Sequence, residues 1–185
     1  MLDIFDGIAG TLARILLVLA CVALVAMAFH ITIDVTMRHF FNRPFEATLE
    51  LGTYYYMVGT SFLALGYAQL YDKHISVDFL LYGLTPRRRM YVELVALILT
   101  ALFVALLAYM STVSAMEKTR SGEYHMLQHI DLLIWPSRWI LAVSQYVFLL
   151  VLLTQIARSI SAALRGEVYE LPREAEEGLG TGGPA

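Results

Sequence analysis

The ionisable residues of this 185-residue chain whose types and spacing most suggest a functional site are His30, Asp34 and Arg38. They lie four residues apart, so a helix would place them on one face. Within a membrane, such a stripe could carry protons or ions. The alternative is structural, with an Asp34–Arg38 ion pair near the interface and His30 bonded to a neighbouring helix. Because the stripe lies at one end of an apolar run, we favour the structural interpretation.

A second pair of histidines, His125 and His129, could bind a metal or haem if both lay on one helix. They fall instead in the polar segment 117–135, with no third ligand at a recognised spacing. Haem held between membrane helices would need histidines on facing spans, and only His30 lies within an apolar run. The sequence also has no Gly-x-Ser-x-Gly or His-Glu-x-x-His motif. We therefore expect no cofactor or metal on this chain and no enzymatic activity.

The elements that carry these residues are predicted by the distribution of charge. Hydrophobic residues make up 58% of the chain and charged residues only 16%, whereas a soluble domain has about half and about a quarter. Four runs without Asp, Glu, Lys or Arg cover residues 15–33, 51–71, 94–116 and 139–157. Each has a length that spans a bilayer as a helix. The sequence predicts an all-α integral membrane protein with transmembrane helices at about 12–34, 46–71, 90–115 and 136–158.

The connections between these spans carry helix starts and a short extra helix. Asn42 predicts a turn, and Pro44 suits a first helical position. Between the second and third spans, Ser76 can cap an interfacial helix with Asp78 in its first turn. Trp135 and Pro136 start the last helix, with Trp135 as an interfacial anchor. Residues 1–165 form the predicted membrane domain, and 166–185 a disordered, acidic, cytoplasmic tail.

The predicted orientation comes from counting Lys and Arg on each side of the membrane. The amino terminus, the second loop and the tail carry eight, and the first and third loops carry five. Both termini are therefore expected in the cytoplasm. A net charge of −3 and the apolar spans argue against nucleic acid as a partner.

Gly52, Gly59 and Gly66 recur every seven residues in the second span. Seven steps of about 100° return a helix to nearly the same face, so the glycines predict a packing seam. The pattern leaves open whether a helix of this chain or of another subunit covers it. For Glu50, near the start of the same span, we favour a bond from Arg38 or Arg43 across the short first loop over the alternative of a role in substrate binding.

Several short motifs, in order, resemble those of one transporter family. The run 38–44 reads Arg-His-Phe-Phe-Asn-Arg-Pro and is followed by Thr-Leu-Glu-Leu at 48–51. His-Ile-Ser-Val-Asp stands at 74–78, Leu-Thr-Pro-Arg-Arg-Arg at 84–89, and Ile-Trp-Pro at 134–136. Together they resemble the small membrane subunit, of the DctQ type, of tripartite ATP-independent periplasmic (TRAP) transporters. The resemblance covers residues 10–160.

The resemblance implies a division of labour in a bacterial inner membrane. A large membrane subunit would bind substrate and sodium, a periplasmic protein would deliver a small organic acid, and this chain would be the scaffold. Two alternatives remain open: a haem-bearing membrane anchor of a redox complex, and a stand-alone carrier of small solutes. The residues expected to serve subunit packing or structure are Arg38, Asn42, Pro44, Glu50, Gly52, Gly59, Gly66, His74, Asp78, Trp135 and Pro136.

Overall fold

The computed structural model describes residues 2–43, 45, 47–70, 85–126 and 131–165. Its elements are α1 (Leu2–Phe41), α2 (Thr48–Leu51), the π-helix η1 (Gly52–Tyr56), α3 (Met57–Leu63), α4 (Leu65–Leu70), α6 (Pro86–Ser121), β1 (Tyr124–Met126), β2 (Asp131–Leu133) and α7 (Trp135–Arg165). Pro44, the predicted interfacial helix with His74 and Asp78, and the predicted tail lie outside the described residues.

Three helices of the described chain are long and apolar enough to cross a membrane. They are Ile4–Phe41, Arg88–Ser121 and Trp135–Arg165. They contain the first, third and fourth predicted spans, and Trp135 and Pro136 begin α7 as expected. Each helix is longer than the roughly 20 residues that the hydrocarbon requires, which implies tilt or protrusion.

The second predicted span has helical structure, but the helix is interrupted. It begins at Thr48, because Ala47 has a left-handed backbone with φ 68°. The π-helix η1 follows, and a turn at Ala64 separates α3 from α4. None of these pieces alone is long enough to cross a membrane, since the longest, α3, has seven residues. We call residues 48–70 the second helical segment.

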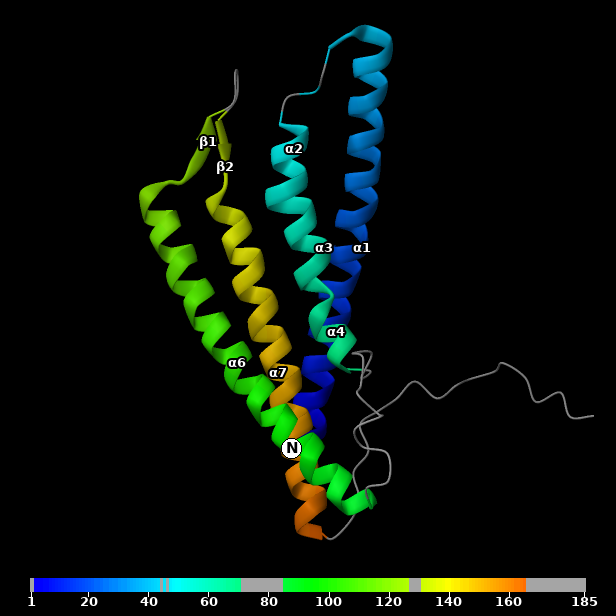
Figure 1. Cartoon of the computed structure of the whole chain (residues 1–185), viewed down its shortest axis with the longest axis vertical. Helices are drawn as coiled ribbons and strands as arrows, with labels where there is room; N and C mark the ends of the chain where they lie inside the picture. The colour runs from blue at the N-terminus through cyan, green and yellow to red at the C-terminus, as the bar shows by residue number, and fades with distance from the viewer. Residues whose placement is uncertain (1, 44, 46, 71–84, 127–130, 166–185) are drawn as a thin grey trace, which may run out of the picture.

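The long elements alternate in direction (Figure 1). α1 and α6 run one way, and the second helical segment and α7 run the other. The start of α1 and the end of α7 lie at one end of the molecule, which we call the terminal end. An ion pair between Asp6 and Arg158 joins them there. The first loop and the β-hairpin lie at the opposite end, which we call the loop end.

α7 is the central helix, because it packs against α6, α1, α3 and α4. In its most apolar stretch 50% of the residues are buried, compared with 17% in α1 and 22% in α6. α6 packs chiefly along α7, through a narrow seam at alternating spacings of three and four. That spacing is typical of helices packed side by side. The seam includes Leu97, Ala101, Val104 and Ala108.

The prediction of an all-helical architecture is confirmed, and one short β element lies in a connection between two helices. The third connection contains a two-stranded antiparallel hairpin, in which Tyr124 pairs with Leu133 and Met126 with Asp131. A glycine ends α6 just before it, since Gly122 has φ 62° and its N–H donates to the carbonyls of Lys118 and Thr119. His125 lies in β1, and His129 is outside the described residues.

Candidate functional site

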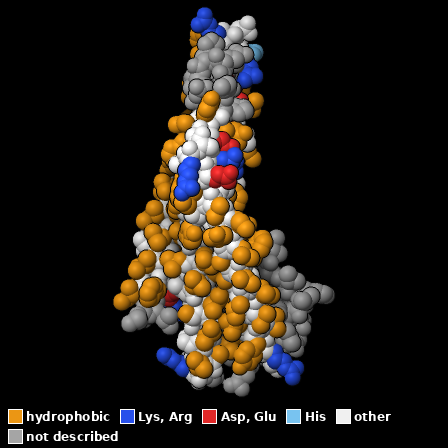
Figure 2. All heavy atoms as spheres, turned by 90° about the vertical axis from the view of Figure 1, so that its left-hand side faces the viewer, with side chains coloured by type: hydrophobic (Ala, Val, Ile, Leu, Met, Phe, Trp, Pro, Cys, Tyr) orange, Lys and Arg blue, Asp and Glu red, His pale blue; other side chains and the backbone are white. Residues whose placement is uncertain are grey.

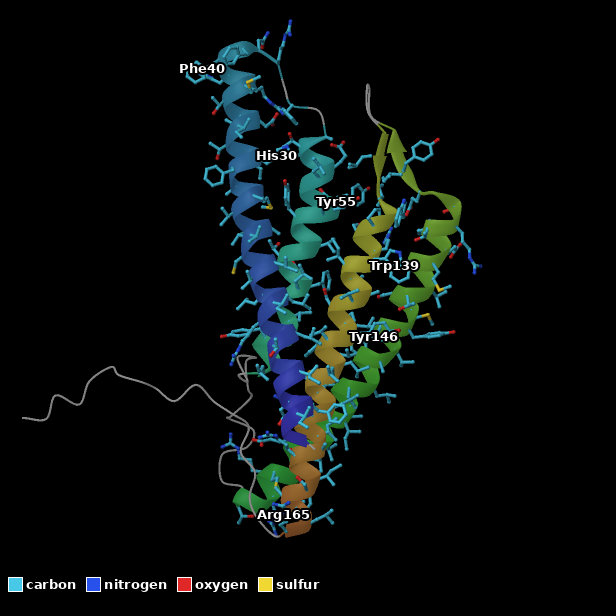
Figure 3. The ribbon with its side chains drawn as sticks, turned by 180° about the vertical axis from the view of Figure 1, so that it is seen from behind. His30, Phe40, Tyr55, Trp139, Tyr146 and Arg165 are labelled. Atoms are coloured by element: carbon cyan, nitrogen blue, oxygen red, sulfur yellow. The ribbon has the colours of Figure 1, made fainter. Side chains whose placement is uncertain are left out.

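The stripe on α1 lies at the loop end, where it faces the start of the second helical segment (Figure 3). Asp34 is only 5% exposed. Its Oδ1 accepts a 2.7 Å bond from the backbone N–H of Phe45, and its Oδ2 accepts a 3.0 Å bond from Arg38. The predicted Asp34–Arg38 pair is therefore confirmed, and Asp34 also fastens the first loop onto α1.

His30 lies one turn below Asp34 and contacts two hydroxyl groups. Its Nδ1 is 3.4 Å from the Tyr56 hydroxyl, and its Nε2 is 3.4 Å from the Thr48 hydroxyl. The ring packs edge-on against Phe45, with the centroids 5.4 Å apart. His30 is thus bonded to the neighbouring helix, as the structural interpretation of the stripe required. We call His30, Asp34, Phe45, Thr48 and Tyr56 the corner cluster.

Two other predictions about this region have different outcomes. Among the described residues, no ion pair joins Glu50 to Arg38 or Arg43, so that expected bond is wrong. Arg38 lies one turn from Asp34 on the same helix and pairs there. Asn42 does form a turn: its φ of 52° is left-handed, and α1 ends at the residue before it.

The glycine seam packs within this chain at two of its three positions. A Cβ on Gly66 would lie 3.4 Å from Val147 Cγ1 and 3.8 Å from Ala13 Cβ. A Cβ on Gly59 would lie 3.6 Å from Ala23 Cβ, and one on Gly52 would meet nothing within 4 Å. Gly52 lies outside the packed seam because the π-helix begins there. A π-helix has more residues per turn than an α-helix, so the seven-residue repeat no longer returns to the same face.

A buried amide pair joins the second helical segment to α7 near the terminal end. Gln69 Nε2 donates to Gln155 Oε1 at 2.8 Å, and Gln155 Nε2 donates to the Gln69 carbonyl at 2.9 Å. Sequence reasoning missed this pair. A signal was present, since both glutamines lie inside charge-free runs, where a polar side chain needs a partner.

At the loop end, the hairpin is held by backbone and side-chain bonds. The Ile134 N–H donates to the Glu123 carbonyl at 3.0 Å, and the Glu123 carboxylate is 3.2 Å from Lys118 Nζ. Trp139 Nε1 donates to Thr119 Oγ1 at 3.0 Å, which ties α7 to α6. The Tyr55 hydroxyl donates to the Leu133 carbonyl at 2.6 Å, from the second helical segment to the hairpin (Figure 3).

The contacts described above hold helices and loops of the subunit together. No three His, Cys, Asp or Glu side chains of the described residues come together where they could hold a metal ion.

The matched family model is that of tripartite ATP-independent periplasmic transporters, DctQ component, over residues 27–162. The chain belongs to this family. No curated protein and no solved structure matches it.

This DctQ component is accordingly a small subunit of a TRAP transporter, a multi-pass membrane protein and not an enzyme. The matched range includes the corner cluster, the contacts of Trp139 with Thr119 and of Tyr55 with Leu133, and almost all of α7. Of α1 it includes only the part from Met27 onward. The family favours the transporter interpretation of the helices over the haem-bearing anchor.

Proposed function

We propose that this DctQ subunit scaffolds the large membrane subunit of a TRAP transporter in a bacterial inner membrane. The complex takes up a small organic acid that a periplasmic binding protein delivers, driven by an ion gradient. Sodium is the expected ion, bound by the large subunit. The observation that carries the proposal is the family match over residues 27–162. It is supported by the ion pair between Asp6 of α1 and Arg158 of α7, which joins two helices of the subunit itself.

The proposed topology has four transmembrane helices, with the second helical segment as the second span. Its 23 residues, from 48 to 70, extend roughly 35 Å at a helical rise, which is enough for the hydrocarbon. The proposed orientation has both termini in the cytoplasm, and it is supported by the excess of Lys and Arg in the amino terminus, the second loop and the tail. The proposed residues for assembly include the corner cluster and the undescribed His74 and Asp78.

Co-purification from native membranes tests the scaffold role. A tagged copy of the full chain, extracted in mild detergent, is expected to bring down a much larger multi-span protein. Reconstitution then separates the roles of the two chains. The pair, with its binding protein and a sodium gradient, should accumulate substrate, and this chain alone should not. Uptake by this chain alone would show that it is a carrier. A Soret band in the purified chain would instead support the haem-bearing anchor.

Cysteine labelling tests the topology. After Cys21 is replaced, single cysteines are introduced at Arg88 and Thr181, and at Asn42 and Glu123. In intact spheroplasts an impermeant thiol reagent should label the positions 42 and 123 only. In inverted vesicles it should label 88 and 181 only. The opposite pattern would invert the orientation, and labelling of 42 and 88 from the same side would remove the second span.

A further inference from the structure

α6 presents an exposed stripe of residues on the side away from its buried seam. The members recur at spacings of three or four residues, so they share one face of the helix. They are Arg88, Tyr91, Val95, Ile98, Leu102 and Leu106, which we call the α6 stripe. The last five are between 46% and 60% exposed. Figure 2 shows a broad apolar surface on one side of the molecule, with Lys and Arg side chains at its lower end, which is the terminal end.

The side chains of the α6 stripe differ in size from those of the buried seam. The buried face of α6 includes Ala101, Ala108 and Ala115, and such small side chains allow two helix backbones to approach closely in lipid. The stripe has no apolar residue smaller than valine. Near its terminal end it carries Tyr91, and tyrosine is typical of the level of the lipid headgroups. The α6 stripe therefore suits acyl chains better than it suits a second helix.

Arg88 begins the stripe at the depth of the headgroups. It precedes the charge-free run 94–116 by six residues, which correspond to about 9 Å of helix. A bilayer is about 40–45 Å thick with its headgroups and about 30 Å thick without them, so each headgroup layer measures about 5–8 Å. An arginine side chain can also lie along apolar surface and extend its guanidinium group to the polar layer. The guanidinium group of Arg88 can therefore reach lipid phosphates.

The charge of Arg88 is not paired within the described part of the chain. Arg88 is exposed, and no ion pair among the described residues involves it. Its neighbour Arg89 differs, because it pairs with Glu93 at 2.8 Å. At the opposite end of α6, Arg120 is also exposed, but the exposed Glu117 lies one turn away, where opposite charges attract each other. Arg88 is therefore available to an anionic group from outside the subunit.

We infer that the α6 stripe binds an anionic phospholipid. The headgroup phosphate accepts hydrogen bonds from the Arg88 guanidinium group, whose planar shape suits phosphate oxygens. The ring of Tyr91 lies beside the headgroup, and an acyl chain follows Val95, Ile98 and Leu102 toward the middle of the bilayer. A zwitterionic lipid has the same phosphate, but its ammonium group offsets the charge that attracts Arg88. The site needs only a headgroup layer at the terminal end, so it depends neither on the membrane orientation nor on the scaffold role.

Native mass spectrometry of the full chain in detergent tests the lipid preference. The probes are phosphatidylglycerol and phosphatidylethanolamine with identical acyl chains. Phosphatidylglycerol is expected to bind about fivefold more tightly, and Arg88→Gln should remove this preference, whereas Arg88→Lys should retain most of it. The matched control is Arg120→Gln, which should leave the preference unchanged because Glu117 offsets the charge of Arg120. Equal binding of both lipids to the unmodified chain, or an unchanged preference in Arg88→Gln, would overturn the inference.

Soluble glycerol phosphate separates a lipid site from a site for free phosphate. It offers a phosphate to Arg88 but has no acyl chain for the apolar part of the stripe. At the concentration of phosphatidylglycerol that half-saturates the chain, glycerol phosphate should not reduce lipid binding. Displacement of the lipid at that concentration would mean that Arg88 binds a phosphate group alone, and the lipid assignment would be wrong.

Photo-crosslinking tests where the lipid lies and what covers the stripe in the membrane. In vesicles, phosphatidylglycerol with a photoreactive group near its headgroup should label the peptide around Tyr91 and Val95 more than the peptide around Val113 and Met116. These four residues are all at least 44% exposed on the same helix, so equal labelling would overturn the inference. In living cells, a benzophenone amino acid in place of Leu102 should form adducts with phospholipid. Adducts with a larger membrane protein, or with a second copy of this chain, would show that protein covers the stripe and would also overturn it.

Discussion

α6 and the second helical segment are both apolar, but they are built in different ways. α6 continues from Pro86 to Ser121 without a break, and its buried seam faces chiefly one neighbour, α7. The second helical segment contacts α1 and α7 and is interrupted by η1 and by the turn at Ala64. A regular helix can follow one neighbour with one repeat of three and four residues. In the second helical segment the register changes at the π-helix and again at the turn, so its two neighbours meet it in different registers along its length.

The chemistry of the two contacts differs accordingly. The α6 seam uses Leu97, Ala101, Val104 and Ala108, without a polar group among them. The second helical segment uses Gly59 and Gly66 for close approach, Gln69 for a buried amide pair, and Thr48, Tyr55 and Tyr56 for hydroxyl contacts. In lipid, close packing and hydrogen bonds hold helices together, because apolar burial against lipid gives little. The interrupted segment therefore relies on close approach and polar contacts along its length, whereas the hydrogen bonds between α6 and α7, at Thr112 and Thr119, lie outside the apolar seam.

The largest effect is expected where the second helical segment lies between two helices. Gly66→Leu should destabilise the isolated subunit by about 3 kcal/mol, since the added side chain meets Val147 and the Phe148 backbone. Gly59→Leu should cost less, about 2 kcal/mol, because only side chains lie near its Cβ. The measurement is the free energy of unfolding in an SDS titration. Gly52→Leu is the control, and a loss there equal to that of Gly66→Leu would contradict the close-packing argument.

A smaller loss is expected at the corner cluster. Asp34→Ala removes the acceptor of the Phe45 N–H and should destabilise the subunit by about 2 kcal/mol. Asp34→Asn keeps an acceptor oxygen and loses the charge that faces Arg38, whose side chain is 61% exposed. Since exposed ion pairs contribute little, Asp34→Asn should cost no more than about 1 kcal/mol. Hydrogen exchange at the Phe45 amide should rise more in Asp34→Ala, and equal rates in both variants would refute the loop-fastening role.

The two regions also differ in how far the sequence predicts them. The charge-free runs locate α1, α6 and α7, because a long regular helix depends on apolar length and cap residues such as Pro86 and Gly122. No comparable sequence pattern indicates that the second helical segment is interrupted at η1 and at Ala64. Gly52 fits a seven-residue repeat in the sequence, yet it lies outside the packed seam because η1 changes the register.

The candidate site shows the same division. The spacing of Asp34 and Arg38 is local, so their pair could be predicted. The Phe45 N–H that Asp34 accepts is a backbone group, and the sequence does not encode which loop amide will approach. Gln69 and Gln155 are 86 residues apart, so their pairing depends on which helices become neighbours. Polar residues within apolar runs indicate that a partner exists but do not identify it.

The amide pair itself should have a modest effect. Gln155→Leu leaves Gln69 buried without its acceptor and should cost about 1 kcal/mol, close to the upper range for polar contacts between membrane helices. Replacing both glutamines by Leu should restore part of that loss, because no unpaired amide then remains. SDS titration of the single and double variants gives the coupling energy directly. Strictly additive losses would mean that the two side chains do not depend on each other.

The smallest effect is expected at Tyr55, whose hydroxyl joins the second helical segment to the hairpin that connects α6 and α7. Tyr55→Phe keeps the ring and removes a single 2.6 Å bond to the Leu133 carbonyl, so the expected loss is about 0.5 kcal/mol. Global unfolding barely detects such a change, whereas a pair of spin labels can report the local separation. Labels at Leu49 and Tyr124, both exposed, should show a broader distance distribution in Tyr55→Phe. Tyr146→Phe is the control, since its hydroxyl contacts Thr112 between α6 and α7 and does not reach the second helical segment. An unchanged distribution in Tyr55→Phe would mean that the corner cluster and the glycine seam alone position the loop end of this segment.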